Sequence, residues 1–255
     1  MANSSKNKSP VFVIPDWPAA ENIRAVFTTR AGGFSSAPCD GFNLGLHVGD
    51  NPGDVADNRQ LLIDSLSLPD VPCYLNQVHG TEVFCADDLH DSANTPAADA
   101  CWSQSLKAVI AIMTADCLPV LLSSKCGSVV AGAHAGWRGL AEGVIENTVS
   151  SLPLPASRLI AWLGPAIGPT KFEVGSEVRS CFISQDQNSG EHFAPVSGDK
   201  YLADLYSLAR DRLHNIGVSA VYGGDACTYS DADRFFSHRR DKGKTGRMAA
   251  LIWKV

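Results

Sequence analysis

Short apolar runs recur along the chain between polar and Gly-rich segments. Each run is rich in Val, Ile, Leu and Ala and is bounded by turn-forming residues, which predicts β-strands. The predicted strands cover residues 23–30, 107–113, 119–124, 128–134, 158–164 and 247–255. Residues 73–86 predict two further short strands, joined by a turn at His79 and Gly80.

Three segments predict helices, covering residues 55–66, 140–152 and 201–217. The last is the clearest, because its apolar residues recur at helical spacing and Gly217 is typical of the position after a helix end. Its apolar positions are Leu202, Leu205, Leu208, Ala209, Leu213 and Ile216. Helices and strands alternate, but hairpins interrupt them. The pattern therefore predicts an α/β (α+β) fold with a mixed β-sheet, hairpins, and helices packed on the sheet.

Length and composition favour one folded domain. The chain has 255 residues, of which 45% are apolar and 19% charged, and no apolar run approaches the roughly 20 residues of a membrane span. No repeat or Pro/Ser-rich linker marks a boundary, so residues 11–255 are predicted to form a single domain. The first ten residues, "MANSSKNKSP", lack the apolar segment of a secretory signal and predict a disordered tail, residues 1–10.

Charge and cysteine content narrow the function classes. The net charge of -6 argues against a sequence-independent nucleic-acid binder, which needs an excess of Lys and Arg. Eight cysteines are spread along the chain without a CxxC pair, so a reducing cytoplasm is the expected location. No membrane association and no protein partner is inferred from these features.

Cys117 and His134 bracket a predicted hairpin. A tight turn centred between Lys125 and Cys126 would place Ser124 opposite Gly127 and, along the same ladder, Cys117 opposite His134. Directly opposed residues have Cβ atoms about 4.5–5.5 Å apart, close enough for a thiolate and an imidazole to share a metal ion. Pro119 and a bulge at Gly127 are features that could shift this register by one residue.

His79, on the turn in "NQVHG", is the candidate third donor. Two His and one Cys leave a fourth zinc position open for substrate, as in catalytic zinc sites. Two alternatives stay open at this point. His79 could be an ordinary hydrogen-bonded loop residue, and Cys117 could be a nucleophile with His134 as its base.

Several Gly-rich or basic loops are predicted to meet at the same edge of the sheet and to form an active-site rim. One of these loops follows His134, leads into a predicted helix and carries Arg138. The free backbone N–H groups at the start of that helix favour binding of an anion. Another, residues 233–247, contains six Lys or Arg residues in an acidic chain. The candidates for substrate or phosphate binding in these loops are Arg138, Arg30, Asn43, Arg240 and His238, and Glu173 is expected at the same edge.

Five motifs resemble those of the laccase-domain proteins, first named multicopper polyphenol oxidoreductases and later described as purine nucleoside phosphorylases. They are "NQVHG", "TADCLPVLL", "GAHAGWRGL", "GPAIGP..FEVG" and "CTYSDADRFFSHRRD...TGRMAALIW", and the resemblance runs from about Val26 to Trp253. It implies zinc ligands at His79, Cys117 and His134. His238 stands where many relatives have Tyr, which leaves a substrate-stacking contact in doubt.

The resemblance further implies phosphorolysis of adenosine, inosine, guanosine and methylthioadenosine, together with adenosine deamination and a suggested role in editing peptidoglycan precursors. Purine nucleosides and phosphate are thus the expected partners. In such chemistry Arg138, Arg30 and Arg240 would neutralise phosphate, and Asp116 and Glu173 would be candidate proton carriers.

A laccase mechanism conflicts with the composition, because several copper ions need on the order of ten His or Cys ligands and the chain has seven His in total. A single Cu2+ at the zinc site is compatible with the same donors. Two rivals remain. One is a metal-free cysteine hydrolase that cleaves an amide, for example in a cell-wall precursor, with Cys117 and His134. The other is a non-enzymatic protein that zinc stabilises.

Overall fold

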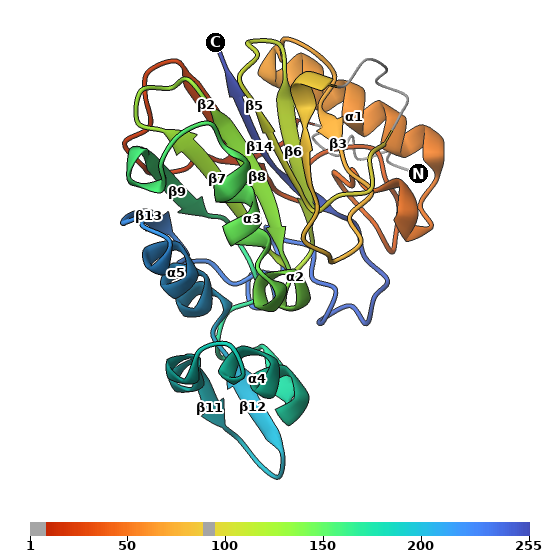
Figure 1. The fold of residues 1–255 in the computed structure, drawn as a ribbon. Coiled ribbons are helices and arrows are strands. Elements are labelled where there is room, and N and C mark those ends of the chain that lie inside the picture. The colour runs from red at the N-terminus through yellow and green to blue at the C-terminus, as the bar shows by residue number, and fades with distance from the viewer. Residues whose placement is uncertain (1–8, 89–94) are drawn as a thin grey trace.

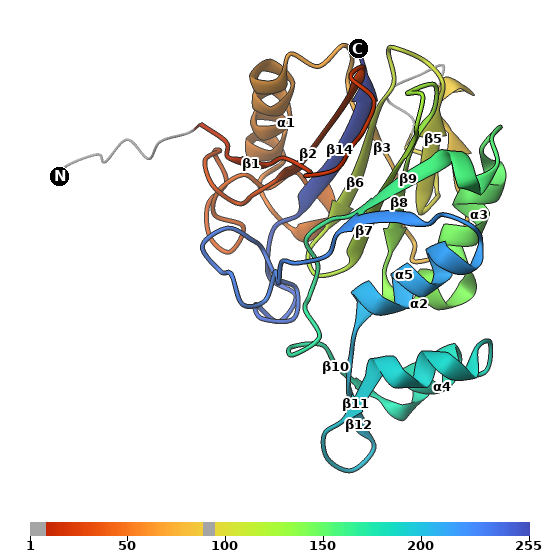
Figure 2. The same ribbon diagram turned by 90° about the vertical axis from the view of Figure 1, so that its left-hand side faces the viewer.

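Two mixed β-sheets lie face to face at the centre of the protein, and helices cover both outer faces (Figures 1 and 2). The computed structural model describes residues 9–88 and 95–255. The tail predicted at residues 1–10 lies outside this part of the chain, apart from Ser9 and Pro10. The predicted α/β class, with mixed strand directions and hairpins, is confirmed, and the strands are divided over three sheets.

The first sheet has five strands in the order β1-β2-β14-β6-β3, and the second has six in the order β13-β9-β7-β8-β5-β4. The first comprises β1 (Phe12–Val13), β2 (Ile23–Thr28), β14 (Met248–Lys254), β6 (Val109–Thr114) and β3 (Cys73–Tyr74). The second comprises β13 (Ala220–Gly223), β9 (Leu159–Leu163), β7 (Leu118–Ser124), β8 (Val130–Ala135), β5 (Ala100–Ser103) and β4 (Val83–Cys85). Each contains parallel and antiparallel pairs.

A smaller antiparallel sheet forms a lobe below the two large ones (Figure 1). It comprises β10 (Glu173–Gly175), β12 (Lys200–Ala203) and β11 (Phe193–Pro195), with helix α4 (Ser176–Ile183) beside it. Phe182 and Phe193 of the lobe belong to the same apolar cluster as the inner strands of the six-stranded sheet, so the lobe shares a core with the rest of the protein.

Helix α1 (Pro52–Leu66) covers the five-stranded sheet, whereas α2 (Trp137–Glu142), α3 (Val144–Ser151) and α5 (Leu205–Asn215) lie beyond the six-stranded one (Figure 2). Strand β6 shows why both faces of its sheet are apolar. Ile110 and Ile112 pack between the two sheets, and Val109 and Ala111 pack toward α1. Alternate residues of a strand point to opposite faces, so a strand covered on both sides is a continuous apolar run.

All the predicted strands are present, but two helix boundaries differ. Helix 140–152 is divided because Gly143 adopts φ 99, and α2 ends there before α3 begins. Helix 201–217 starts at Leu205, since the Asp204 side chain accepts from the first free backbone N–H groups while residues 200–203 pair in a sheet. No helix in the described part of the chain is both long and apolar enough to span a bilayer.

The predicted hairpin register was wrong. His134 pairs with Pro119, and Ser123 pairs with Val130, so Cys117 is not opposite His134 and lies just before the strand. The connection spans residues 125–129, longer than the tight turn expected. The Ser124 hydroxyl accepts from the N–H groups of residues 128 and 129 and stabilises this longer loop.

Candidate metal centre

His79, Cys117 and His134 converge at one end of the two-sheet core. Their ligand atoms lie within 4.8 Å of one another, and the two imidazole rings meet edge to face with centroids 4.9 Å apart. His134 is buried, Cys117 is half-buried and His79 is exposed. Within residues 9–88 and 95–255, no other group of three His, Cys, Asp or Glu side chains is this close. The cluster expected from the sequence is therefore assembled by the fold.

Two crossings between the sheets carry the first two donors. Cys117 lies between β6 of one sheet and β7 of the other, and His79 lies between β3 and β4, which also belong to different sheets. Each crossing turns sharply through a left-handed residue, Asp116 at φ 88 and His79 itself at φ 62. His134 comes from β8. The site thus sits where the chain passes from sheet to sheet.

Asp99 orients two of the three donors. Its buried carboxylate lies 2.8 Å from Nδ1 of His134, which leaves Nε2 of that ring for the cluster. The same carboxylate accepts hydrogen bonds from the backbone N–H groups of Val78, His79 and Gly80 at 2.7–3.0 Å. A carboxylate on the outer nitrogen of a histidine is the usual partner of a metal ligand.

Gly136 leaves room for the cluster. A Cβ atom there would lie 3.1 Å from Sγ of Cys117 and 3.3 Å from Cδ2 of His79. One turn further, a Cβ at Gly139 would lie 2.7 Å from the carbonyl oxygen of Gly80, so helix α2 packs directly on the turn that carries His79. Both glycines are needed for close approach.

The electrostatics of the cluster favour a thiolate. Burial opposes ionisation of the Cys117 thiol, but charge and hydrogen bonds from His134 and His79 lower its pKa to about 6. Burial also opposes protonation of His134, yet Cys117 and the Asp99 carboxylate raise its pKa to about 9. For Asp99, the His134 hydrogen bond and backbone N–H groups overcome burial and lower the pKa.

The donor chemistry fits a metal ion such as Zn2+. Thiolate sulfur and imidazole nitrogen are its usual protein ligands, and three ligands with a fourth position open are characteristic of catalytic zinc sites. The Asp99 hydrogen bond and the space at Gly136 support the same use of the residues. The donor set alone does not select between zinc and copper.

Asp116 lies in the same turn as Cys117, immediately before it, but its carboxylate is hydrogen-bonded within the protein. Oδ1 accepts from the Thr228 hydroxyl at 2.6 Å, and Oδ2 accepts from the Ser237 hydroxyl at 3.0 Å and from the Arg239 backbone N–H at 2.6 Å. These contacts tie the basic segment 233–247 to the turn that carries Cys117. Asp116 therefore holds the basic segment against the turn of Cys117.

Three of the predicted substrate contacts have their polar groups bound within the protein. Asn43 is fully buried and bonds Gly45, Asp50 and the Arg247 N–H. Arg30 pairs with Asp40 at 2.8 Å and lies over the Phe236 ring. Arg240 bonds Asp241 and the carbonyl oxygens of Thr228, Tyr229 and Phe235.

The other three are exposed. Arg138, in the first turn of α2, lies with its guanidinium 4.4 Å from the Trp137 ring centroid. His238 is on the basic segment. Glu173 is on β10 in the lobe, where its carbonyl oxygen accepts from the Arg239 guanidinium at 2.7 Å. No contact joins their side chains to the three donors in the described part of the structure.

Sequence reasoning missed Asp99 and Gln77. The Gln77 amide bonds both the N–H and the C=O of Met113 at 2.8 Å, extending the pairing of β3 with β6 up to the His79 turn. A lone acid in the apolar stretch "PAADACW" is the signal that could have found Asp99, since a buried carboxylate needs partners.

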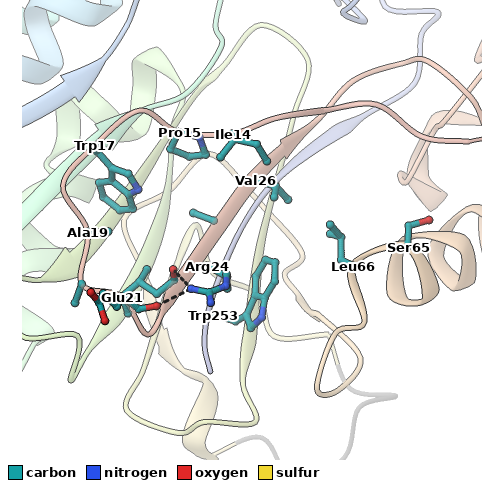
Figure 3. A pocket seen from close by; sticks show the side chains of 13 residues that line it. Ile14, Pro15, Trp17, Ala19, Glu21, Arg24, Val26, Ser65, Leu66 and Trp253 are labelled. Atoms are coloured by element: carbon teal, nitrogen blue, oxygen red, sulfur yellow. Dashed lines mark hydrogen bonds between the residues drawn. The ribbon is translucent and has the colours of Figure 1, made fainter.

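A separate hollow of about 480 Å3 lies away from the cluster (Figure 3). Trp17, Arg24 and Trp253 are among its lining residues, and none of the three donors is. The Arg24 guanidinium bonds the backbone carbonyls of Glu21 and Ile23. Glu21 is the one carboxylate among its lining residues, and no His or Cys lines it.

Comparisons with known proteins match the chain to a family and to individual relatives. The family described as multi-copper polyphenol oxidoreductase laccase matches residues 24–255. Purine nucleoside phosphorylase YfiH of Escherichia coli is 49% identical over 243 residues, covering 95% of this chain and 98% of that protein. The crystal structure of Neisseria meningitidis protein NMB0706 superposes with a TM-score of 0.91 at 47% identity, covering 95% of this chain and 98% of that one.

Proposed function

We propose that this chain, which belongs to the multi-copper polyphenol oxidoreductase laccase family, is a purine nucleoside phosphorylase that uses a metal ion at His79, Cys117 and His134. Two relatives that are 49% identical, from Escherichia coli and Pseudomonas aeruginosa, carry that enzyme name. The observation that carries the proposal is the convergence of three metal-binding donors within 4.8 Å. The laccase reaction that the family's name implies would need several copper ions, and therefore more ligands than this one group of three donors offers.

We assign zinc as the ion and the cytoplasm as the location. Two imidazoles and a thiolate hold zinc in catalytic sites, and a bound zinc ion would supply Lewis acidity toward a substrate oxygen. All eight cysteines are unpaired, which fits a reducing compartment. Copper is the competing ion, and metal analysis of protein purified without added metal distinguishes the two.

Phosphorolysis joins a phosphate oxygen to C1′ of the ribose as the bond from C1′ to the base nitrogen breaks, and the base leaves with a proton. The protein's part is to position the two substrates and to balance their charge. Asp99 fixes His134, and the Gly136 backbone keeps the cluster accessible. Of the three arginines expected to bind phosphate, Arg138 has its guanidinium at the surface, whereas Arg30 and Arg240 are engaged in internal bonds.

The test is product analysis with adenosine, inosine, guanosine and methylthioadenosine, each with and without phosphate. We expect the free base and ribose 1-phosphate (or its methylthio analogue) to form only with phosphate. The rate should fall after chelation and return with Zn2+. Base release that ignores phosphate, or no base release from any of the four, would refute the assignment. Conversion of adenosine to inosine in the same samples tests the accompanying deaminase activity, for which Asp116 and Glu173 are the candidate proton carriers.

A cysteine hydrolase is the second candidate function. The line from Asp99 through His134 to Cys117 has the order of a carboxylate, a base and a nucleophile, as in thiol hydrolases. It would cleave an amide, for example in a peptidoglycan precursor. Amidase turnover that survives chelation and is lost on alkylation of Cys117 would support this function over the phosphorylase.

A further inference from the structure

Arg247 lies beside the metal centre and has no carboxylate partner. It belongs to the basic segment and immediately precedes β14. One terminal nitrogen of its guanidinium donates to the carbonyl oxygens of Thr245 and Gly246 at 3.1–3.2 Å. Among residues 9–88 and 95–255, no ion pair involves Arg247, and its other two nitrogens make no hydrogen bond. Met248 pairs with Thr114, so Arg247 lies at the end of β6 that leads into the turn of Cys117. Burial lowers the pKa of the Arg247 guanidinium, while Cys117, Cys39 and Asp116 act to raise it.

The loop at residues 43–48 holds Arg247 in place. Asn43 accepts from the Arg247 N–H at 2.8 Å, and the Leu44 N–H donates to the Arg247 carbonyl at 3.1 Å. The stem of the side chain crosses Gly45, where an added Cβ would lie 2.8 Å from its Cγ. The guanidinium is thus positioned through its backbone and its stem, and its outer edge is left for a ligand.

Two further basic residues, Arg59 and His47, lie at the same loop. Arg59, from α1, donates to the Leu44 carbonyl at 2.9–3.0 Å and lies 3.7 Å from the centroid of the Tyr74 ring. His47 is on the same loop, and partial burial, followed by the charges of Arg247 and Arg59, lowers its pKa. Its imidazole is therefore neutral at pH 7 and offers a hydrogen bond rather than a charge. Asp50, which follows this loop, accepts a hydrogen bond from the Asn43 amide and forms no ion pair with Arg247 or Arg59.

A half-buried guanidinium without a hydrogen-bonded carboxylate is stabilised when it binds an anion. Arg30, Arg138 and Arg240 were the arginines expected from the sequence to meet phosphate, but Arg247 lies at the strand end that leads to Cys117. A guanidinium with an unoccupied edge matches the geometry of a phosphate group.

We propose that Arg247, assisted by His47 and Arg59, forms the binding site for inorganic phosphate next to the metal centre. This inference rests on the proposed phosphorylase function and names the part of the site that takes its second substrate. The role of Arg247 in binding phosphate does not follow from the motifs around the three donors.

The test compares zinc-loaded wild type with Arg247→Gln, Gly45→Ala and His47→Asn. Arg158→Gln is the matched control, because Arg158 is exposed in the short helix at residues 156–158, at the start of β9. The measurements are the KM for phosphate, the KM for inosine, the zinc content, and the Kd for inorganic phosphate by calorimetry without nucleoside. Arg247→Gln should raise the phosphate KM and Kd by at least about ten-fold, with inosine KM and zinc content unchanged.

Gly45→Ala should act in the same direction without removing a charge, since the new Cβ displaces the Arg247 stem. His47→Asn should weaken phosphate by a smaller factor, and it decides the matter if Arg247→Gln does not fold, because His47 is a surface side chain. An unchanged phosphate Kd in these variants overturns the phosphate site. If wild type binds phosphate through Arg247 but releases no base, the phosphorylase assignment fails and the anion site stands.

Discussion

The Asp99 carboxylate lies 2.8 Å from Nδ1 of His134 and also accepts from the N–H of His79. One buried side chain therefore fixes the ring of one metal donor and the backbone of another. Burying a carboxylate is unfavourable, and here its four hydrogen-bond partners compensate for that burial. Because these partners hold two of the three donors, the geometry of the donor set is fixed by the fold.

Asp99→Asn should weaken metal binding by about 10- to 100-fold. The amide cannot accept from all four donors at once, so the His134 ring and the His79 turn lose their common anchor. Competition with a chromogenic chelator measures the affinity. Asp211→Asn is the matched control, since Asp211 forms a similar bond to His192 at 2.6 Å away from the metal centre. Equal metal affinity in Asp99→Asn and wild type would contradict the account.

Gly136→Ala should reduce metal loading while the fold is kept. Gly136 has φ -60, which alanine adopts readily, but the new methyl group would crowd Cys117 and His79 at 3.1–3.3 Å. Metal stoichiometry and circular dichroism together measure the effect. Gly190→Ala provides the control, because its Cβ meets neighbours only at ordinary contact distances of 3.4 Å or more. Full loading of Gly136→Ala would show that the space is not needed.

Gln77→Ala should lower the free energy of unfolding by about 2 kcal/mol, because two hydrogen bonds to the Met113 backbone are lost. Urea denaturation of the metal-free protein measures it. Gln60→Ala is the comparison, since its amide bonds only Asp64 on the exposed face of α1, and a change within about 0.5 kcal/mol is expected there. Equal losses for the two variants would argue against a special role for Gln77.

Cys126 should be the first thiol to react with iodoacetamide. Hydrogen bonds with Ser128, followed by Ser124, lower its pKa to about 7, so its thiolate is present above pH 7 and is lost as the pH falls below it. Its rate should drop about ten-fold between pH 8 and pH 6. Mass spectrometry of labelled peptides measures this against Cys181, the other exposed cysteine. A rate independent of pH in this range would refute the lowered pKa, and alkylation tests of Cys117 require a Cys126→Ser background.

The sequence predicts the long strands β2, β6, β7, β8, β9 and β14 because each is a separate apolar run. It does not predict β1, β5 or β10 to β13, none of which exceeds four residues. It indicates the three donors because His79 and Cys117 lie in turns between strands and His134 lies near the end of β8. It predicts the antiparallel pairing of β7 with β8 but not the register, since the loop at residues 125–129 depends on hydrogen bonds of Ser124 that spacing does not encode.

The supporting residues are harder to find from the sequence. Asp99 is separated from His79 by 20 positions and from His134 by 35, and the pairing of β5 with β4 on one side and with β8 on the other brings it to both. Arg30 and Arg240 illustrate the opposite case. Both are in loops with the composition of a binding rim, yet tertiary contacts occupy their guanidinium groups.

Metal content and phosphorolysis measured together on wild type and Cys117→Ala test the central claim most directly. Zinc is determined by mass spectrometry on protein purified without added metal, and base release from inosine is followed with phosphate present. The account predicts about one zinc per chain in wild type and the loss of both zinc and turnover in Cys117→Ala. A Cys117→Ala variant that has lost its metal but still phosphorolyses inosine at the wild-type rate would contradict it.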